Sequence, residues 1–545
     1  MSKISFLTLA LSCGLSCLGL QAQDDPKWDD TQKKDWDKAF EKVEIPSSVD
    51  GKKQAAILYK AKSEKPKPLI VSLHTWSGDY TQKDPLAKEI LARDWNYIHP
   101  DFRGPNNSPE AMGSTLVISD IADAIDFALE NTNTDPNGVH IIGVSGGGYA
   151  TLLAFMNLDY PVKSFSAWAP ISDIEAWYWE SVGRDQKYAG DILQALEADS
   201  VVFKEEEALK RSPIAHEFPV EKRKGSQLFI YEGIHDGYTG SVPITHSINM
   251  YNRLVGELKY GTSEMDKIIK KAADDPDLVS PQSTIELLTK RMDPNYDPNF
   301  NLFGRNIYLY RNFGNISLTL FEGGHEQLPQ ALSLIPIKAI SPMKANILTL
   351  GDSNGEHVGG WVDQLKEILP QSKIVNISKS GRTIGFDNLG RTELNALKNI
   401  QTYLNEAEEE IGNESYDYIL LCLGTNDTKS VFAERQDEVV INFEKLVDTI
   451  LEHDLVKKEK AQLLFITPPP IRTENIIEKY QGGNERLAAL MPKFKSILEQ
   501  REVPVVDVFN PLQGVLDYYA EDGVHMSPEG QEIIAGKILD RLKNY

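Results

Sequence analysis

Residues 138–147 read Gly-Val-His-Ile-Ile-Gly-Val-Ser-Gly-Gly, and they decide the fold of the first half of the chain. The apolar run before Ser145 is typical of a buried strand, and residues 149–155 have helical character. The Gly-x-Ser-x-Gly string between them fits a sharp strand-to-helix turn, in which small residues let the helix pack against the strand. The stretch therefore predicts an α/β fold with the Ser145 hydroxyl exposed at a strand end.

Two later residues supply what a reactive serine requires. A serine hydroxyl is a weak nucleophile without a base, and the base needs an orienting acid. Asp236 follows an apolar run at 227–231, and His325 follows another at 316–321. Both stand in glycine-flanked loops, so we expect them at the strand ends where Ser145 lies. His74 follows the apolar run at 68–73 and marks the loop that we expect to supply an oxyanion N–H group.

The pattern around this motif alternates strand-like and helix-like segments. Apolar runs at 68–73, 97–101, 138–143 and 227–231 are separated by segments of helical period, which predicts a parallel sheet with crossover helices. The pattern stops at a proline-punctuated stretch, 336–342, and restarts at 345. We expect one domain at 23–340 and a second at 341–545.

Four short sequence motifs characterise the second domain. They are Gly351-Asp-Ser-Asn-Gly355, the segment 376–383 that contains Gly381, Gly424-Thr-Asn-Asp427, and Asp522-Gly-Val-His525. In this order, Ser353 is the expected nucleophile, His525 its base and Asp522 the acid that orients His525. The backbone N–H groups of Ser353 and Gly381 and the side-chain amide of Asn426 are the expected oxyanion donors.

Both halves resemble known families. Residues 50–335 resemble the α/β-hydrolase superfamily, most closely its prolyl-oligopeptidase-like and secreted esterase branches. The resemblance implies a doubly wound sheet with Ser145, Asp236 and His325 as the triad and the backbone N–H groups of Gly146 and of Thr75 or Trp76 as oxyanion donors. The segment between Asp236 and His325 is longer than the family core needs, which implies an insertion near 252–305. The loop after the first long strand, at His74, lacks the His-Gly-Gly run common in esterases. Residues 345–545 resemble the SGNH (GDSL-type) hydrolases, named for residues that are here Ser353, Gly381, Asn426 and His525. That resemblance implies a flavodoxin-like three-layer α/β fold, ester hydrolysis, often of O-acetyl groups on sugars, and no cofactor.

The composition and the N-terminal segment indicate which partners and which cellular location to expect. The chain of 545 residues carries 57 basic and 80 acidic residues, a net charge of −23, which disfavours nucleic acid as a partner. Lys3 and an apolar stretch at 4–20 predict a signal peptide over 1–22, hence export to the periplasm or the extracellular space, and no other run is long enough to be an integral membrane span. After cleavage Cys422 alone remains, so we expect no internal disulfide, and Cys422 itself lies in a strand-like run.

Several residues fit a structural role as well as a functional one. His235 and His357 are expected to be packing or surface residues, although His357 is placed where it could touch substrate. Trp177 and Trp179 fit either a core or a sugar-stacking platform, and we favour the core. No cysteine–histidine cluster has metal-ligand spacing, so no metal is expected.

The sequence therefore predicts a secreted serine esterase with two catalytic domains, acting on acetyl or similar O-acyl esters of a carbohydrate. A peptidase of the prolyl-oligopeptidase type is the alternative for the first domain, although no β-propeller pattern precedes it. A third possibility is that one domain is a non-catalytic carbohydrate-binding relative. The sequence leaves the oligomeric state open.

Overall fold

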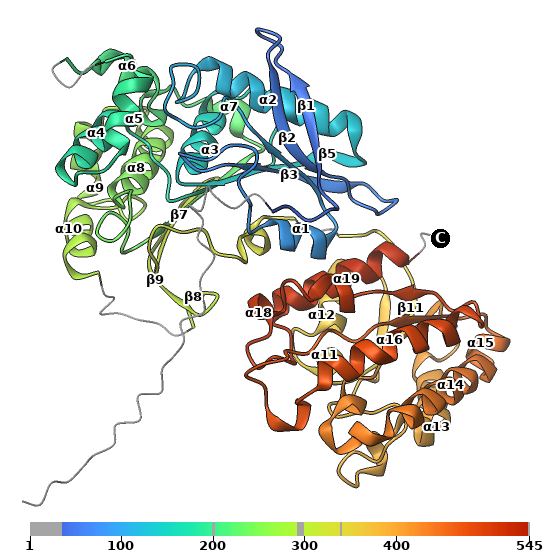
Figure 1. The fold of residues 1–545 in the computed structure, drawn as a ribbon. Coiled ribbons are helices and arrows are strands. Elements are labelled where there is room, and N and C mark those ends of the chain that lie inside the picture. The colour runs from blue at the N-terminus through green and yellow to red at the C-terminus, as the bar shows by residue number, and fades with distance from the viewer. Residues whose placement is uncertain (1–34, 199–201, 292–298, 338–339, 543–545) are drawn as a thin grey trace, which may run out of the picture.

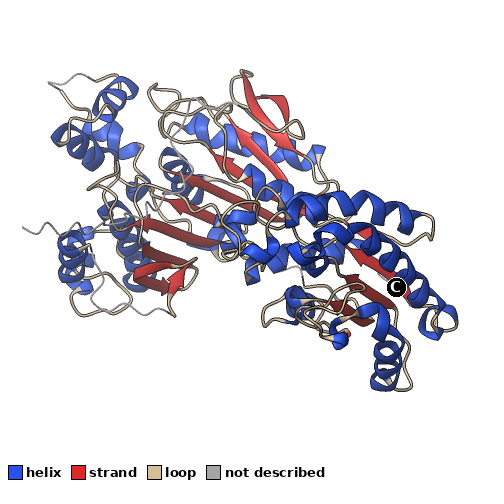
Figure 2. Cartoon of the chain, turned by 60° about the horizontal axis from the view of Figure 1, so that its bottom comes forward, coloured by secondary structure: helices blue, strands red, loops and turns tan. Residues whose placement is uncertain are grey.

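A computed structural model describes residues 35–198, 202–291, 299–337 and 340–542 (Figure 1). The segment predicted as a signal peptide, 1–22, lies outside the described residues. Within these ranges the strands form a ten-stranded and a five-stranded sheet, both flanked by helices (Figure 2). Across the same ranges, no helix combines the length and the apolar character needed to cross a membrane.

The larger sheet has a parallel centre and antiparallel edges. Its spatial order is β1 (Glu41–Pro46), β2 (Lys53–Tyr59), β4 (Asn96–Pro100), β3 (Lys67–Leu73), β5 (Thr134–Val144), β6 (Ser164–Trp168), β7 (Gln227–Gly233), β10 (Ile316–Phe321), β9 (Arg305–Phe313) and β8 (Asn301–Leu302). Neighbours from β4 to β10 run parallel, as the sequence predicts, whereas β1, β2, β8 and β9 join in antiparallel pairs. The sequence analysis did not identify β1 and β9, whose residues are mostly exposed or half-buried, and it also did not identify the buried apolar end of β2.

Alternate residues of the central strands feed two cores on opposite faces of this sheet. In β3, Leu69, Val71 and Leu73 contact the first core, and Ile70 contacts the second. Helices α2 (Thr115–Asn131), α3 (Gly146–Asn157) and α8 (Thr245–Tyr260) supply apolar residues to the first. Helix α1 (Ala87–Arg93) and the 3₁₀ helix η2 (Ala331–Leu334) cover the second.

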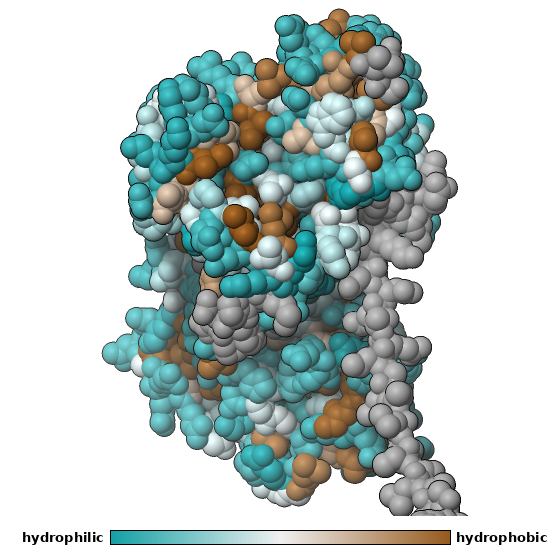
Figure 3. Space-filling view, turned by 90° about the vertical axis from the view of Figure 1, so that its left-hand side faces the viewer, coloured by the Kyte–Doolittle hydropathy of each residue, from teal (hydrophilic) through white to brown (hydrophobic). Residues whose placement is uncertain are grey.

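Further helices lie between β6 and β8 along the chain, and most of those labelled in Figure 1 are on its left. They are α4 (Ile174–Gly183), α5 (Tyr188–Ala195), α6 (Glu205–Lys210), η1 (Pro213–Ala215), α7 (Val220–Arg223), α9 (Met265–Ala272) and α10 (Pro281–Lys290). Helices α9 and α10 occupy much of the segment predicted as an insertion. Figure 3 looks onto this side, where apolar side chains stand among hydrophilic ones; the exposed apolar residues of α4, α6 and α10 are Trp179, Val182, Leu209 and Ile285.

The smaller sheet is wholly parallel, in the order β12 (Lys373–Asn376), β11 (Asn346–Gly351), β13 (Tyr418–Cys422), β14 (Gln462–Ile466) and β15 (Val505–Val506). Successive residues of its strands again face opposite sides of the sheet, so that Ile419 contacts one core and Leu420 the other. One face is covered by α13 (Ala396–Ile411), α14 (Gln436–Glu452), α15 (Asp454–Lys457) and α16 (Gly483–Glu499). The other is covered by α12 (Trp361–Ile368), α17 (Phe509–Leu512), α18 (Leu516–Tyr519) and α19 (Pro528–Arg541). This is the three-layer arrangement that the sequence predicts.

Cys422 is buried at the end of β13 and forms no disulfide. Burial raises the pKa of its thiol well above the ordinary value, so the thiolate is disfavoured. The side chain is therefore the structural thiol expected from the sequence.

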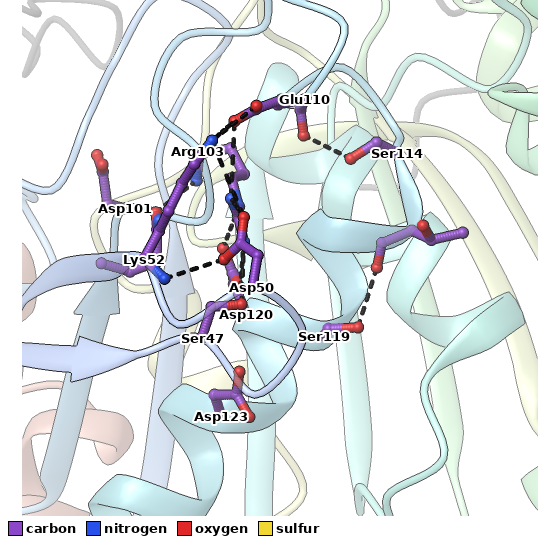
Figure 4. Close-up of polar contacts among 12 residues, drawn as sticks. Ser47, Asp50, Lys52, Asp101, Arg103, Glu110, Ser114, Ser119, Asp120 and Asp123 are labelled. Atoms are coloured by element: carbon purple, nitrogen blue, oxygen red, sulfur yellow. Dashed lines mark hydrogen bonds and ion pairs between the residues drawn. The ribbon is translucent and has the colours of Figure 1, made fainter.

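A buried arginine fastens the β1–β2 hairpin to α2 (Figure 4). Arg103 has a positive φ of 81°, and its guanidinium donates to Asp120 on α2 and to Ser47 and Asp50 in the hairpin. The Nε–Oδ2 distance to Asp120 is 2.6 Å, and both side chains are almost completely buried. This bidentate pairing fixes the edge strands without contributing to either candidate site.

The two α/β units contact each other through α1 and α19, which lie side by side in Figure 1. Lys67 Nζ lies 2.6 Å from Asp540 on α19, and Lys65 Nζ donates to the carbonyl groups of Leu539 and Leu542. Deeper in this interface, Arg93 pairs with Glu89 at 2.9 Å, and the Tyr519 hydroxyl of α18 donates to Glu89. Ion pairs and hydrogen bonds thus join residues separated by more than 400 positions in the chain.

Candidate active sites

Ser145 occupies the strand-to-helix turn that the sequence predicts. It stands between β5 and α3 with φ 58° and ψ −119°, a strained conformation for a residue other than glycine. Its N–H donates to Trp168 O at 2.9 Å, and its carbonyl accepts from Tyr149 N at 2.9 Å. The backbone on both sides of the serine is therefore held in place.

Asp236 and His325 form the predicted acid–imidazole pair. The His325 Nδ1–Asp236 Oδ2 distance is 2.6 Å, and Asp236 Oδ1 accepts from the N–H groups of Gly237 at 2.8 Å and Val242 at 3.0 Å. Asp236 follows β7 and His325 follows β10, so both lie at the carboxyl edge of the sheet where β5 brings Ser145. This pairing fixes the imidazole with Nδ1 toward the carboxylate, which leaves Nε2 as the nitrogen able to accept a proton.

The oxyanion prediction left Thr75 and Trp76 as alternatives, and the geometry favours Trp76. Thr75 N donates to Gln82 Oε1 at 3.2 Å, so that N–H is already used. A Cβ on Gly146 would lie 2.3 Å from Trp76 N, which shows how closely the two backbone segments approach. His74 shapes this loop: its Nε2 lies 2.8 Å from Asp101 O, and its ring stacks on Phe102.

Replacing Gly146 with alanine is expected to disable this site while leaving the other intact. The new methyl group would meet backbone atoms of Trp76 at 2.3 and 2.4 Å, and backbone cannot move aside as a flexible side chain can. Loss of one oxyanion donor lowers rates by about 10²–10³. We expect fluorophosphonate labelling of Ser145 to slow by about that factor, with Ser353 labelling in the same molecule as the internal reference.

Gly183→Ala is the matched control for Gly146→Ala. Gly183 ends α4, and a Cβ added there would have no atom within 4 Å, so the methyl group fits without displacement. Labelling of Ser145 in this variant should equal that of the unsubstituted chain. Equal labelling in Gly146→Ala would contradict the predicted oxyanion role of this turn.

The second predicted constellation is assembled with all three side chains in contact. Ser353 begins the short helix α11 (Ser353–Glu356) directly after β11, and its Oγ lies 2.9 Å from His525 Nε2. His525 Nδ1 lies 2.6 Å from Asp522 Oδ2. Asp522 Oδ1 accepts from the N–H groups of Val524 at 2.9 Å and His525 at 2.8 Å, so the loop closes on its own carboxylate. The Asp-x-x-His spacing therefore orients the imidazole as predicted.

Gly381 and Asn426 lie next to each other beyond this relay. Gly381 has φ +84°, which glycine adopts without strain. Asn426 Nδ2 donates to Arg382 O at 3.1 Å, while Asn426 Oδ1 accepts from the Tyr480 hydroxyl at 2.9 Å. Because the Arg382 carbonyl can only accept, it fixes the nitrogen end of the Asn426 amide, and the second N–H of that nitrogen remains available for a negative oxygen.

Both acids are ionised partners of their histidines. Burial pushes the pKa of Asp236 upward, but the charge and hydrogen bond of His325 outweigh it, and the pKa falls below its ordinary value. For Asp522, burial again opposes ionisation, and hydrogen bonds from the His525 backbone and side chain lower the pKa overall. Each carboxylate can therefore stabilise an imidazolium.

The structure separates residues that the sequence left ambiguous. Trp177 is fully buried as favoured, whereas Trp179 is 55% exposed, because residues two apart on a helix face different directions. His357 follows α11, and its ring centre lies 5.0 Å from that of His525, so the histidine expected at a helix surface lies beside the site. Tyr480, Asn388 and Lys429 also surround the site, and no motif identified them.

Comparisons with known proteins agree with this division. Residues 93–271 match the family model of the prolyl oligopeptidase family, and residues 348–533 match that of the GDSL-like lipase/acylhydrolase family. Both are families of serine hydrolases, which confirms the predicted class of serine hydrolase and the α/β fold class, and the match of residues 348–533 to a lipase/acylhydrolase family agrees with the predicted action on ester bonds. The two family resemblances expected from the sequence are likewise confirmed.

Individual relatives resemble parts of the chain. A GDSL esterase/lipase from Oryza sativa subsp. japonica is 26% identical over 117 residues, covering 20% of this chain and 44% of that protein. A carbohydrate acetylesterase family member from Sinorhizobium meliloti aligns with 22% identity and a TM-score of 0.30 over 36% of this chain and 95% of its own. A puromycin-hydrolyzing peptidase from Mycobacterium tuberculosis aligns with 17% identity and a TM-score of 0.33 over 43% of this chain and 37% of its own. The chain thus spans less than half the length of the curated relative that it matches.

Proposed function

We propose that this chain is an exported esterase that removes acetyl or similar O-acyl groups from a polysaccharide or oligosaccharide, using two serine nucleophiles. The observation that carries the proposal is the unbroken Ser353–His525–Asp522 relay, with distances of 2.9 and 2.6 Å. The apolar stretch at 4–20 supports export, and two serine sites in one chain suit a substrate that carries several acyl groups.

The proposed reaction at the second site follows from these contacts. Ser353 Oγ attacks the acyl carbon and its proton passes to His525 Nε2, while Asp522 stabilises the imidazolium. The resulting oxyanion accepts hydrogen bonds from the Ser353 and Gly381 N–H groups and the Asn426 amide. The sugar alcohol leaves with the proton from His525, and a water molecule, deprotonated by the same imidazole, then releases the acid.

An exposed indole on helix α4 is a second observation that suits a carbohydrate substrate. Helix α4 packs on the oxyanion loop through Trp177, whose ring centre lies 4.6 Å from that of Trp76. The same helix presents Trp179, 55% exposed, to solvent. A wide, rigid aromatic face of this kind offers the apolar side of a sugar ring a stacking surface.

Acetate release from O-acetylated xylan and pectin tests the proposal. The full chain is expected to release acetate above the level of a Ser145→Ala/Ser353→Ala double variant, which lacks both nucleophiles and serves as the blank. Methanol measured from the same pectin distinguishes removal of acetyl groups from removal of methyl esters. A full chain that releases no more acetate than the double variant from any acetylated carbohydrate would exclude this function.

A peptidase activity of the first domain is the second candidate, and the match of residues 93–271 to the prolyl oligopeptidase family favours it. Cleavage of an Xaa-Pro-nitroanilide by the full Ser353→Ala chain would support it. In that chain Ser145 is the remaining predicted nucleophile, so the addition of Ser145→Ala should abolish the cleavage.

A further inference from the structure

Lys429 is a buried lysine beside the second site. It follows Asn426 by three residues and is 6% exposed. Its Nζ donates to Asn388 Oδ1 at 3.3 Å and lies 5.7 Å from the centre of the Tyr480 ring. Among the residues that the structure describes, no carboxylate lies within 4.0 Å of this ammonium group. An ammonium group is costly to bury without a paired charge, so its retention calls for a specific role.

Both neighbours of the ammonium group contact the predicted oxyanion donors. Asn388 is 2% exposed, and its Nδ2 donates to Gly381 O at 2.7 Å. Because the lysine occupies Oδ1, the amide cannot flip without placing its NH₂ group against a cation. Tyr480 donates to Asn426 Oδ1 at 2.9 Å. The Lys429 ammonium group therefore contacts each predicted oxyanion donor through one intervening side chain, that of Asn388 or that of Tyr480.

We propose that Lys429 is a positioning residue of the second site: its ammonium group holds Asn388 against Gly381, packs on the Tyr480 ring that supports Asn426, and keeps positive charge beside the oxyanion. The inference rests on the proposed ester hydrolysis. Positive charge in a poorly solvated site acts on the transition state, where the oxygen becomes negative, more than on the neutral bound ester. Loss of the charge should therefore lower kcat and change KM little.

The charged groups around Lys429 make this role sensitive to pH. Burial, followed by the like charge of Lys479, lowers the pKa of Lys429 to about 8 against the opposing effects of Asp427 and Asp352, and burial raises the pKa of Asp427 itself to about 7. Below about pH 8 the ammonium form predominates, and above it the charge is lost. The activity of the second site is thus expected to fall as the pH rises through this value.

The proposal is tested by introducing Lys429→Met or Lys479→Gln into a chain that carries Ser145→Ala. The rate of p-nitrophenyl acetate hydrolysis is measured, and the rate of the Ser145→Ala/Ser353→Ala variant is subtracted as the uncatalysed background. In Lys429→Met, kcat should fall about tenfold or more, KM should stay within about threefold, and the alkaline fall near pH 8 should disappear. Lys479 is exposed, so Lys479→Gln should leave the fold unchanged and move the alkaline fall to higher pH. Lys493→Gln, which removes a surface lysine paired with an exposed aspartate, is the control and should leave both unchanged.

Each outcome bears on one hypothesis. An unchanged alkaline fall in both Lys429→Met and Lys479→Gln, or a kcat of Lys429→Met within twofold of its parent, would overturn the role of Lys429. If Lys429→Met does not fold, the Lys479→Gln profile decides. If the parent chain hydrolyses no ester, the proposed function fails instead, and the rate of fluorophosphonate labelling at Ser353 across the same pH range still tests Lys429.

Discussion

Ser353→Ala is expected to reduce ester hydrolysis by the second site about 10⁴–10⁶-fold, measured in a chain that already carries Ser145→Ala. The Oγ that it removes is the atom 2.9 Å from His525 Nε2, so the variant lacks the predicted nucleophile of the relay. The loss should appear in kcat, because the serine acts on the reacting bond rather than on substrate binding. Kinetics with p-nitrophenyl acetate and mass spectrometry of fluorophosphonate-labelled peptides measure it.

His525→Ala should cause a loss of similar size, and the Ser353→Ala/His525→Ala double variant should lose little more than either single variant. Residues that act as one unit have strongly non-additive effects on rate. His357→Ala discriminates between the two neighbouring imidazoles: we expect a small loss, and a large loss there together with a small loss in His525→Ala would assign the base to His357. Ser496→Ala, on the exposed side of α16, is the matched serine control and should retain full activity.

The sequence predicted those parts of the sites that short strings and strand ends determine. Ser353 and His525 are 172 residues apart in the chain. Ser353 follows a parallel strand and His525 lies in a loop at the same edge of the sheet, so their contact could be expected. The orientation of His525 followed from Asp522 three residues earlier. The assignment of Trp76 rather than Thr75 could not be made from sequence, because it depends on the hydrogen bond from Thr75 to Gln82.

Residues that act through long-range packing carried no such signal. Tyr480 reaches Asn426 from 54 positions away, and Lys429 reaches Asn388 from 41, both through loops with no recurring motif. The antiparallel strand β9 was missed because most of its residues are exposed or half-buried and its apolar run, 307–310, is short and flanked by polar residues. Contacts of this kind depend on how loops fold over the sheet, and hydrophobic periodicity does not encode them.

Arg93→Met is expected to lower the free energy of unfolding by about 3–5 kcal/mol, the cost of leaving a buried charge without its partner. Glu89 is fully buried, and burial raises the pKa of its carboxyl group while Arg93 opposes that rise. Without Arg93, the carboxyl group must either take up a proton or remain charged in an apolar setting. Arg93 also donates to Ser333 at 2.6 Å beside Tyr519, so the change weakens the contact between the two α/β units. Urea denaturation monitored by tryptophan fluorescence measures the difference.

Two further variants separate a buried charge from a general loss of packing. Adding Glu89→Gln to Arg93→Met should restore part of the lost stability, because removal of both charges costs less than removal of one. Arg391→Met removes an arginine from an exposed pair with Glu393 at 2.7 Å and should change stability by about 1 kcal/mol or less. If Arg93→Met were no more destabilising than Arg391→Met, the Glu89–Arg93 pair would not hold the interface. If the double variant were no more stable than Arg93→Met, the unpaired charge of Glu89 would not be the cause of the lost stability.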